Sequence, residues 1–255
     1  MTVTKLRSDR PAGIDAEEWA LRIDLAACYR LIDHHGMTDL IFTHVTARVP
    51  GPDHHILINP YTYFFEEVTA SNLVKCDLDA TVIGDSGHKP NPIGFNFHAV
   101  VHEARDDAQC VIHTHSHAGI VVSTMKRGLL PLTQTALRFK DQLGFHAYEG
   151  VLPDKSELRR MVEALGDKKG ILMGNHGLLI VGRSIPEAFH LIYYLEQACR
   201  LQIDLAASGE ELIELPQDVQ DQARDYFVNN PNPTGEREWP AHLRMLDRID
   251  PSYRT

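Results

Sequence analysis

The chain has 255 residues, 43% of them hydrophobic, and a formal net charge of −10 at pH 7. This acidic balance argues against nucleic acid or an anionic membrane surface as a partner, because both are bound through basic patches. The four cysteines are widely spaced, and no stretch has the length and apolar character of a signal peptide or a membrane span, so we expect reduced thiols, no membrane insertion and a cytoplasmic location.

A chain of this length can bury one large core, and we expect one main domain. Residues 1–14 are interpreted as a flexible N-terminal leader. Residues 15–215 hold the periodic segments and are predicted to form the domain. Residues 216–255 are predicted to form a C-terminal arm over the surface or onto a neighbouring subunit.

The first half of the domain begins with a helix from Asp15, a capping residue followed by acidic residues, to Gly36. The β-rich segments 41–49 and 56–58 flank a Gly-Pro-Asp turn and predict a hairpin. A third strand is expected at 73–78. After a loop rich in Gly, Pro, Asp and Ser, a helix is expected at about 95–104.

The second half alternates apolar runs with helical patterns. A strand is expected at 110–112 and a helix at about 117–126. Two further strands are predicted at 171–173 and 178–181, and the longest helix runs from Pro186 to the C-capping Gly209. Strands framed by helices predict an α/β fold, a three-layer α/β/α sandwich whose central sheet is mixed and largely antiparallel because of the hairpin.

Three histidines form the strongest candidate site. His113 and His115 are two residues apart at the end of an apolar strand, so their side chains point to the same face. Neutral imidazoles so placed can share a divalent metal if a third ligand arrives from elsewhere. His176 is the best candidate, because it lies in a tight, glycine-flanked turn between two apolar runs. The alternative for each is a buried, hydrogen-bonded histidine.

These motifs resemble the class II aldolase/adducin family from about residue 18 to residue 209, and are closest to the adducin head domain and its bacterial relatives. The segments that carry the resemblance are Ile58-Asn59-Pro60, Phe65-Glu66-Glu67-Val68-Thr69-Ala70-Ser71-Asn72-Leu73-Val74-Lys75, Val111-Ile112-His113-Thr114-His115, Gly128-Leu129-Leu130-Pro131, Tyr148-Glu149-Gly150 and Asn175-His176-Gly177-Leu178. The resemblance implies a nine-stranded type of α/β/α sandwich and a homotetramer. It also implies one divalent metal ion per subunit, zinc first and manganese or iron as alternatives, bound by His113, His115 and His176.

The sequence departs from the aldolase branch of this family at the catalytic position. The family's acid/base glutamate falls on Gly94, which has no side chain to move a proton. The two serines that hold a substrate phosphate fall on Pro92 and Ile93, the asparagine of the phosphate turn falls on His44, and a pocket glycine aligns with Thr62. Cleavage of sugar phosphates is therefore disfavoured. On this alignment, Gly94→Glu is expected to return a carboxylate to the metal and leave the fold intact.

Two residues are candidates for the catalytic role that the glutamate leaves open. His98 lies one helical turn after Gly94 and is either a fourth ligand or base, or a packed, hydrogen-bonded histidine. Tyr148 lies in a segment that approaches the active-site cleft in the family. It is either a proton donor near the metal or a half-buried tyrosine bonded to the backbone.

Two functions from different classes remain. The first is a metal-dependent lyase, a decarboxylase or aldolase-like enzyme, acting on a small non-phosphorylated oxo- or hydroxy-acid, with iron-dependent oxidation at the same site as a variant. The second is a non-catalytic, adducin-like oligomeric scaffold or actin-binding module. Stoichiometric metal would favour the enzyme, and metal-free tetramers would favour the scaffold.

Overall fold

A single mixed sheet forms the centre of the computed structural model, which describes residues 10–230 and 234–255. Its strands are β1 (His44–Arg48), β2 (Ile56–Ile58), β3 (Val74–Cys76), β4 (Cys110–Thr114), β5 (Leu143–His146), β6 (Gly170–Met173) and β7 (Gly177–Gly182). They lie in the order β3-β2-β1-β4-β7-β6-β5. Only β5 and β6 pair in parallel; every other neighbouring pair is antiparallel. This confirms the predicted fold class, although the described residues form seven strands where the family resemblance implied a nine-stranded type.

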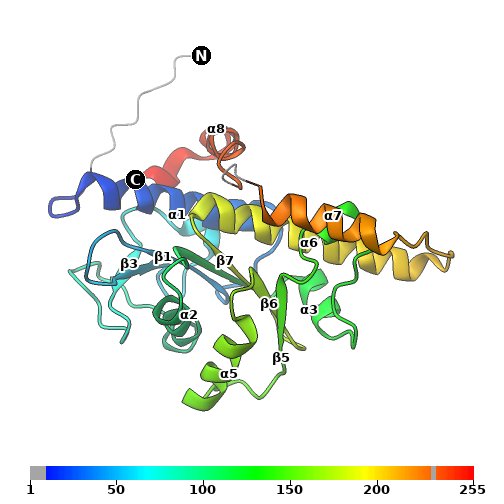
Figure 1. Ribbon diagram of the computed structural model, residues 1–255. Helices are drawn as coiled ribbons and strands as arrows, with labels where there is room; N and C mark the ends of the chain where they lie inside the picture. The colour runs from blue at the N-terminus through cyan, green and yellow to red at the C-terminus, as the bar shows by residue number, and fades with distance from the viewer. Residues whose placement is uncertain (1–9, 231–233) are drawn as a thin grey trace.

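Helices cover both faces of the sheet (Figure 1). They are α1 (Ala16–His34), α2 (Pro92–Ala104), α3 (His117–Ser123), α4 (Gln134–Leu137), α5 (Lys155–Leu165), α6 (Ile185–Ser208), α7 (Gln217–Val228) and α8 (Trp239–Ile249), with short 3₁₀ turns at Phe65–Glu67 and Pro251–Arg254. Helices α1, α3 and α6 pack on one face, and α2 and α5 pack on the other. Alternation along β4 divides these cores, because Ile112 points to the first face and Val111 to the second.

Local signals in the sequence account for the ends of the longest helices. The Asp15 carboxylate accepts a hydrogen bond of 2.8 Å from the Glu18 N–H, which caps α1 as predicted. Gly209 ends α6 in the left-handed conformation, with φ at 70°, also as predicted. Helix α2 begins earlier than expected, at Pro92, because the side chain of Asn91 caps it.

A buried tyrosine attaches α1 to β1 and to the end of β2. The Tyr29 hydroxyl accepts hydrogen bonds from the backbone N–H groups of Val45, at 2.8 Å, and Asn59, at 3.1 Å. It also lies within donating distance of the Val45 carbonyl and the Asn59 side chain. These hydrogen bonds hold the start of β1 and the end of β2 against α1.

The segment predicted to be an arm contains α7 and α8. Its last part packs against the domain of the same chain. Tyr253 is fully buried, and its carbonyl accepts a hydrogen bond from the Ala70 N–H. The Trp239 indole donates to Asp24 on α1 at 2.9 Å. Most of the predicted leader, residues 1–9, lies outside the described residues. Among the residues that are described, no helix combines the length and apolar character needed to cross a membrane.

Candidate metal centre

The three predicted ligands come from two neighbouring antiparallel strands. His113 lies in β4 and His115 just beyond its end, while His176 lies in the turn that leads into β7. The turn is positioned by Gly177, where an added Cβ would lie 2.2 Å from the carbonyl oxygen of Thr114. Only glycine allows β7 to start this close to β4. Asn175 supplies the left-handed residue of the turn, with φ at 56°.

The Nε2 atoms of the three histidines converge on one point. The Nε2 of His115 lies 2.9 Å from the Nε2 of His113 and 2.9 Å from that of His176. His113 is buried, and the other two are partly exposed. Within residues 10–230 and 234–255, this is the group of at least three His, Cys, Asp or Glu side chains whose geometry could hold a metal ion.

Hydrogen bonds on the far side of two rings show why a cation fits between them. The Nδ1–H of His113 donates to the Leu178 carbonyl at 2.9 Å, and the Nδ1–H of His115 donates to the Asp39 carboxylate at 2.8 Å. A neutral imidazole with hydrogen on Nδ1 has a bare lone pair on Nε2. Two such lone pairs 2.9 Å apart repel each other, and a metal ion between them converts the repulsion into coordination.

The electrostatics of the rings also suit a metal. Burial lowers the pKa of His113 well below its usual 6.5, and the nearby His115 and His176 lower it further. Burial likewise lowers the pKa of His176 to about 4. Both rings are therefore neutral at pH 7, which is the form that binds metals.

Asp39 holds the ring of His115 through a hydrogen bond, and this role was not predicted from the sequence. It lies in the loop after α1, 76 residues before the histidine to which it is bonded. A carboxylate that accepts from a ligand histidine fixes the tautomer and orientation of the ring. A lone aspartate in a loop gives no sequence signal for this role, because only the folded chain brings it to β4.

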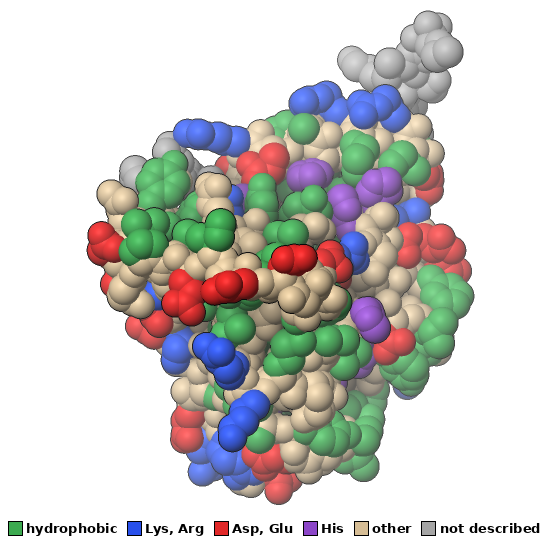
Figure 2. Space-filling model, turned by 90° about the vertical axis from the view of Figure 1, so that its right-hand side faces the viewer, with side chains coloured by type: hydrophobic (Ala, Val, Ile, Leu, Met, Phe, Trp, Pro, Cys, Tyr) green, Lys and Arg blue, Asp and Glu red, His purple; other side chains and the backbone are tan. Residues whose placement is uncertain are grey.

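Tyr148 lies at the edge of the centre. It follows β5, its side chain is half-exposed, and its ring centroid is 6.2 Å from that of His176 in an edge-to-face arrangement. The surface there is apolar, with Phe145, Val151 and Leu152 exposed by 57 to 73%. Figure 2 shows the side of the molecule on which β5 and α3 lie, where hydrophobic side chains are exposed alongside histidines.

His44 fills the space that the family's glutamate would need. It faces His113 across the β1–β4 pair, and the two rings are stacked with centroids 6.4 Å apart. A Cβ added at Gly94 would lie 1.8 Å from Cε1 of His44. The expectation that Gly94→Glu leaves the fold intact is therefore wrong, because the imidazole already occupies that volume. His44 is 6% exposed, and neither of its ring nitrogens has a hydrogen-bond partner.

His98 contacts His44, which in turn is stacked on His113. Its ring centroid is 5.7 Å from that of His44, and it is not among the three converging histidines. Its Nδ1 is 2.8 Å from the Thr46 hydroxyl, whereas its buried Nε2 has no partner. Burial lowers the pKa values of His98 and His44, the latter to about 3, so both are neutral at pH 7.

Comparison with known proteins gives matches along nearly the whole chain. The family model described as Class II Aldolase and Adducin N-terminal domain matches residues 23–203. A Pseudomonas aeruginosa protein assigned to aldolase class 2 is 44% identical over 256 residues, covering 99% of this chain and 98% of that protein. The alpha-adducin of Mus musculus is 38% identical over 268 residues, covering 99% of this chain but 36% of its own length.

Solved structures give the same result. An aldolase II superfamily protein from Pseudomonas syringae superposes with a TM-score of 0.92 at 42% identity, covering 95% of this chain and 98% of that one. The L-fuculose 1-phosphate aldolase from Glaciozyma antarctica superposes with a TM-score of 0.82 at 28% identity, covering 97% and 98%.

Proposed function

Because the chain belongs to the class II aldolase and adducin family, we propose that it is a metal-dependent carbon–carbon lyase for a small, non-phosphorylated oxo- or hydroxy-acid. The observation that carries this proposal is the convergence of three imidazole Nε2 atoms on one point. Three imidazoles suit zinc first, and manganese or iron as alternatives. Iron at the same site would support the oxidative variant.

The residues around the centre favour a reaction that begins without proton abstraction by the protein. A bound divalent ion supplies Lewis-acid stabilisation of the negative charge that develops when a carbon–carbon or carbon–carboxylate bond breaks. Gly94 offers no side chain to remove a proton. Decarboxylation needs no such step, because carbon dioxide leaves with the bond cleavage itself. Tyr148, at the edge of the centre, is the proposed donor of the proton that completes the product.

The start of α2 supports a substrate without a phosphate group. Helix N-termini bind phosphate through free backbone N–H groups. Here Pro92 has none, and the N–H groups of Ile93 and Gly94 point to the side-chain oxygen of Asn91, at 3.1 and 3.5 Å. The similarity to an L-fuculose 1-phosphate aldolase therefore supports the lyase chemistry more strongly than the sugar-phosphate substrate.

A scaffold is the second candidate, because the chain is 38% identical to a segment that makes up 36% of an alpha-adducin. The exposed apolar side chains after β5 support self-association, proposed here as a homotetramer. A scaffold does not require three converging imidazoles, so the metal content separates the two functions.

The test measures metal in the purified protein after dialysis, by elemental analysis. We expect one divalent ion per chain, none in His115→Ala, and an affinity lower by about 10- to 100-fold in Asp39→Asn. His117→Ala is the matched control, since this exposed histidine begins α3 and is outside the converging group. Full metal retention by His115→Ala would overturn the assignment of the ligands.

Activity is then tested on the metal-loaded protein with sugar phosphates and with small oxo- and hydroxy-acids. We expect carbon dioxide release or aldol cleavage only with the acids. Robust cleavage of fuculose or ribulose phosphates would contradict the proposed substrate class. A metal-free tetramer with no activity would favour the scaffold.

A further inference from the structure

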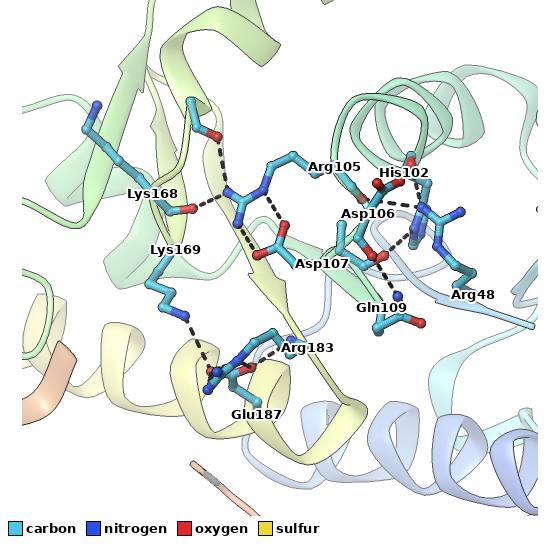
Figure 3. Close-up of polar contacts among 12 residues, drawn as sticks. Arg48, His102, Arg105, Asp106, Asp107, Gln109, Lys168, Lys169, Arg183 and Glu187 are labelled. Carbon is cyan, nitrogen blue, oxygen red and sulfur yellow. Dashed lines mark hydrogen bonds and ion pairs between the residues drawn. The ribbon is translucent and has the colours of Figure 1, made fainter. Parts of the chain in front are cut away.

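A row of buried hydrogen bonds leads from Ala108, just before the start of β4, toward the metal centre. The His102 Nδ1 lies 2.8 Å from the Ala108 carbonyl, and the His102 Nε2 lies 2.8 Å from the Thr46 hydroxyl. The same hydroxyl lies 2.8 Å from the His98 Nδ1. Figure 3 shows how the outer end is held: the Arg48 guanidinium contacts the backbone carbonyl of His102 at the end of α2.

The carbonyl at the outer end sets the direction of every hydrogen in this row. A carbonyl can only accept, so His102 donates from Nδ1 and must accept at Nε2 from the Thr46 hydroxyl. The Thr46 oxygen then accepts from the Nδ1–H of His98. The Nε2 of His98 is left with a bare lone pair, fully buried and without a partner.

Three ring nitrogens without a hydrogen-bond partner therefore lie on two neighbouring rings beside the metal centre: the Nε2 of His98 and both nitrogens of His44. A neutral His44 carries one N–H and one lone pair, so the three atoms comprise two acceptors and one donor. Buried polar atoms are nearly always paired, so these nitrogens require a partner that no described residue supplies. The excess of acceptors calls for a ligand that brings a hydrogen.

On this basis we propose that His44 contacts the substrate directly and accepts a hydrogen bond from a hydroxyl group of a small hydroxy-acid held at the metal centre. The proposal rests on the proposed function and narrows its substrate class to acids that carry a hydroxyl group, with or without an oxo group. A ketone or carboxylate oxygen can only accept, so it can pair with the one N–H but leaves both lone pairs unpaired. A hydroxyl group both donates and accepts.

The placement of His44 fits this role. Its ring is stacked on that of the ligand His113 and fills the space beside Gly94. His98 contacts the His44 ring edge-to-face and is itself held by the Thr46 hydroxyl, so both are positioning residues. The family's glutamate and this imidazole would compete for one volume, which explains why glycine occurs at residue 94 together with histidine at residue 44.

The experiment uses the zinc-loaded full chain and three probes of similar size, lactate, pyruvate and propionate, with affinities measured by calorimetry. His44→Leu removes both nitrogens at similar volume, and His44→Asn keeps a donor and an acceptor. We expect His44→Leu to bind lactate about tenfold more weakly, the loss of one hydrogen bond, and to bind pyruvate and propionate within about twofold of the wild type. His44→Asn should recover most of the lactate affinity. Zinc content is measured in every sample.

Nitrogen NMR of the wild-type imidazoles gives a readout that needs no folded variant. We expect His98 to carry its hydrogen on Nδ1, and lactate, but not propionate, to shift a His44 nitrogen. An Nε2–H tautomer of His98, or equal losses of lactate and pyruvate in His44→Leu at unchanged zinc content, would overturn the proposal while leaving the lyase function standing. If the zinc-loaded wild type binds none of the acids, the proposed function fails, and this inference fails with it.

Discussion

Gly94 and His44 fit together because the glycine leaves room for the imidazole ring, and this ring fills the space beside the proposed metal ligands. A methyl group at residue 94 would overlap the His44 ring, since the added Cβ would lie 1.8 Å from its Cε1. We expect Gly94→Ala to lower the free energy of unfolding by about 1–3 kcal/mol, the usual cost of overpacking a core. Urea denaturation of the metal-free protein measures this cost.

The matched control is the same substitution in a His44→Ala background. With the ring removed, the methyl group has room, and alanine is favoured over glycine in a helix by about 0.5–1 kcal/mol. The two substitutions should therefore be strongly non-additive. Additive effects would show that the ring and the glycine do not share this volume.

The turn between β6 and β7 determines the position of His176, the third proposed ligand. Gly177 leaves no room for a side chain against the Thr114 carbonyl, so Gly177→Ala must push β7 and the neighbouring His176 away from β4. We expect this variant to lose both stability, by about 1–3 kcal/mol, and metal affinity, as measured by denaturation and by metal titration.

Asn175→Gly is the control in the same turn. Residue 175 already has a positive φ and is exposed, so glycine fits its conformation, and we expect stability within about 0.5 kcal/mol of the wild type. Metal affinity that is unchanged in Gly177→Ala would contradict the view that this contact positions His176.

Across the whole molecule, buried neutral histidines make the fold sensitive to acid. Burial lowers the pKa of His102 to about 3, and that of His44 to about 3. In the unfolded chain both titrate near 6.5, so between these values the unfolded state binds more protons. Their contribution to stability is complete above about pH 6.5 and is lost as the pH falls toward 3, by up to about 1.4 kcal/mol per pH unit for each ring.

Denaturation of the metal-free protein at pH 7.0, 5.5 and 4.5 measures this loss. Carboxylates such as Glu187 and Asp247, whose pKa values are lowered by Arg183 and Arg254 against the effect of burial, lose their contribution only below about pH 4 and do not mask it. A free energy of unfolding that stays constant from pH 7.0 to 4.5 would contradict the neutral, buried state of these rings.

Features that depend on neighbours in the chain were predictable from the sequence alone. The cap at Asp15, the glycine after α6 and the alternation of His113 and His115 are local patterns that report helix ends and a shared strand face. Helix α5 was not predicted, although Asp154 caps it and Leu158, Met161 and Leu165 follow at helical spacing. In that case the cap and the helical spacing are local signals that the sequence itself carries.

Only the tertiary structure decided which residues surround the proposed metal ligands. Asp39 reaches His115 from a distant loop, and His44 meets Gly94 from an opposing strand. The orientation of hydrogens from Ala108 to His98 depends on contacts among β1, α2 and the start of β4. Local sequence sets the periodicity and the ends of each element, but these contacts join residues far apart in the chain, and their geometry exists only once the elements are packed.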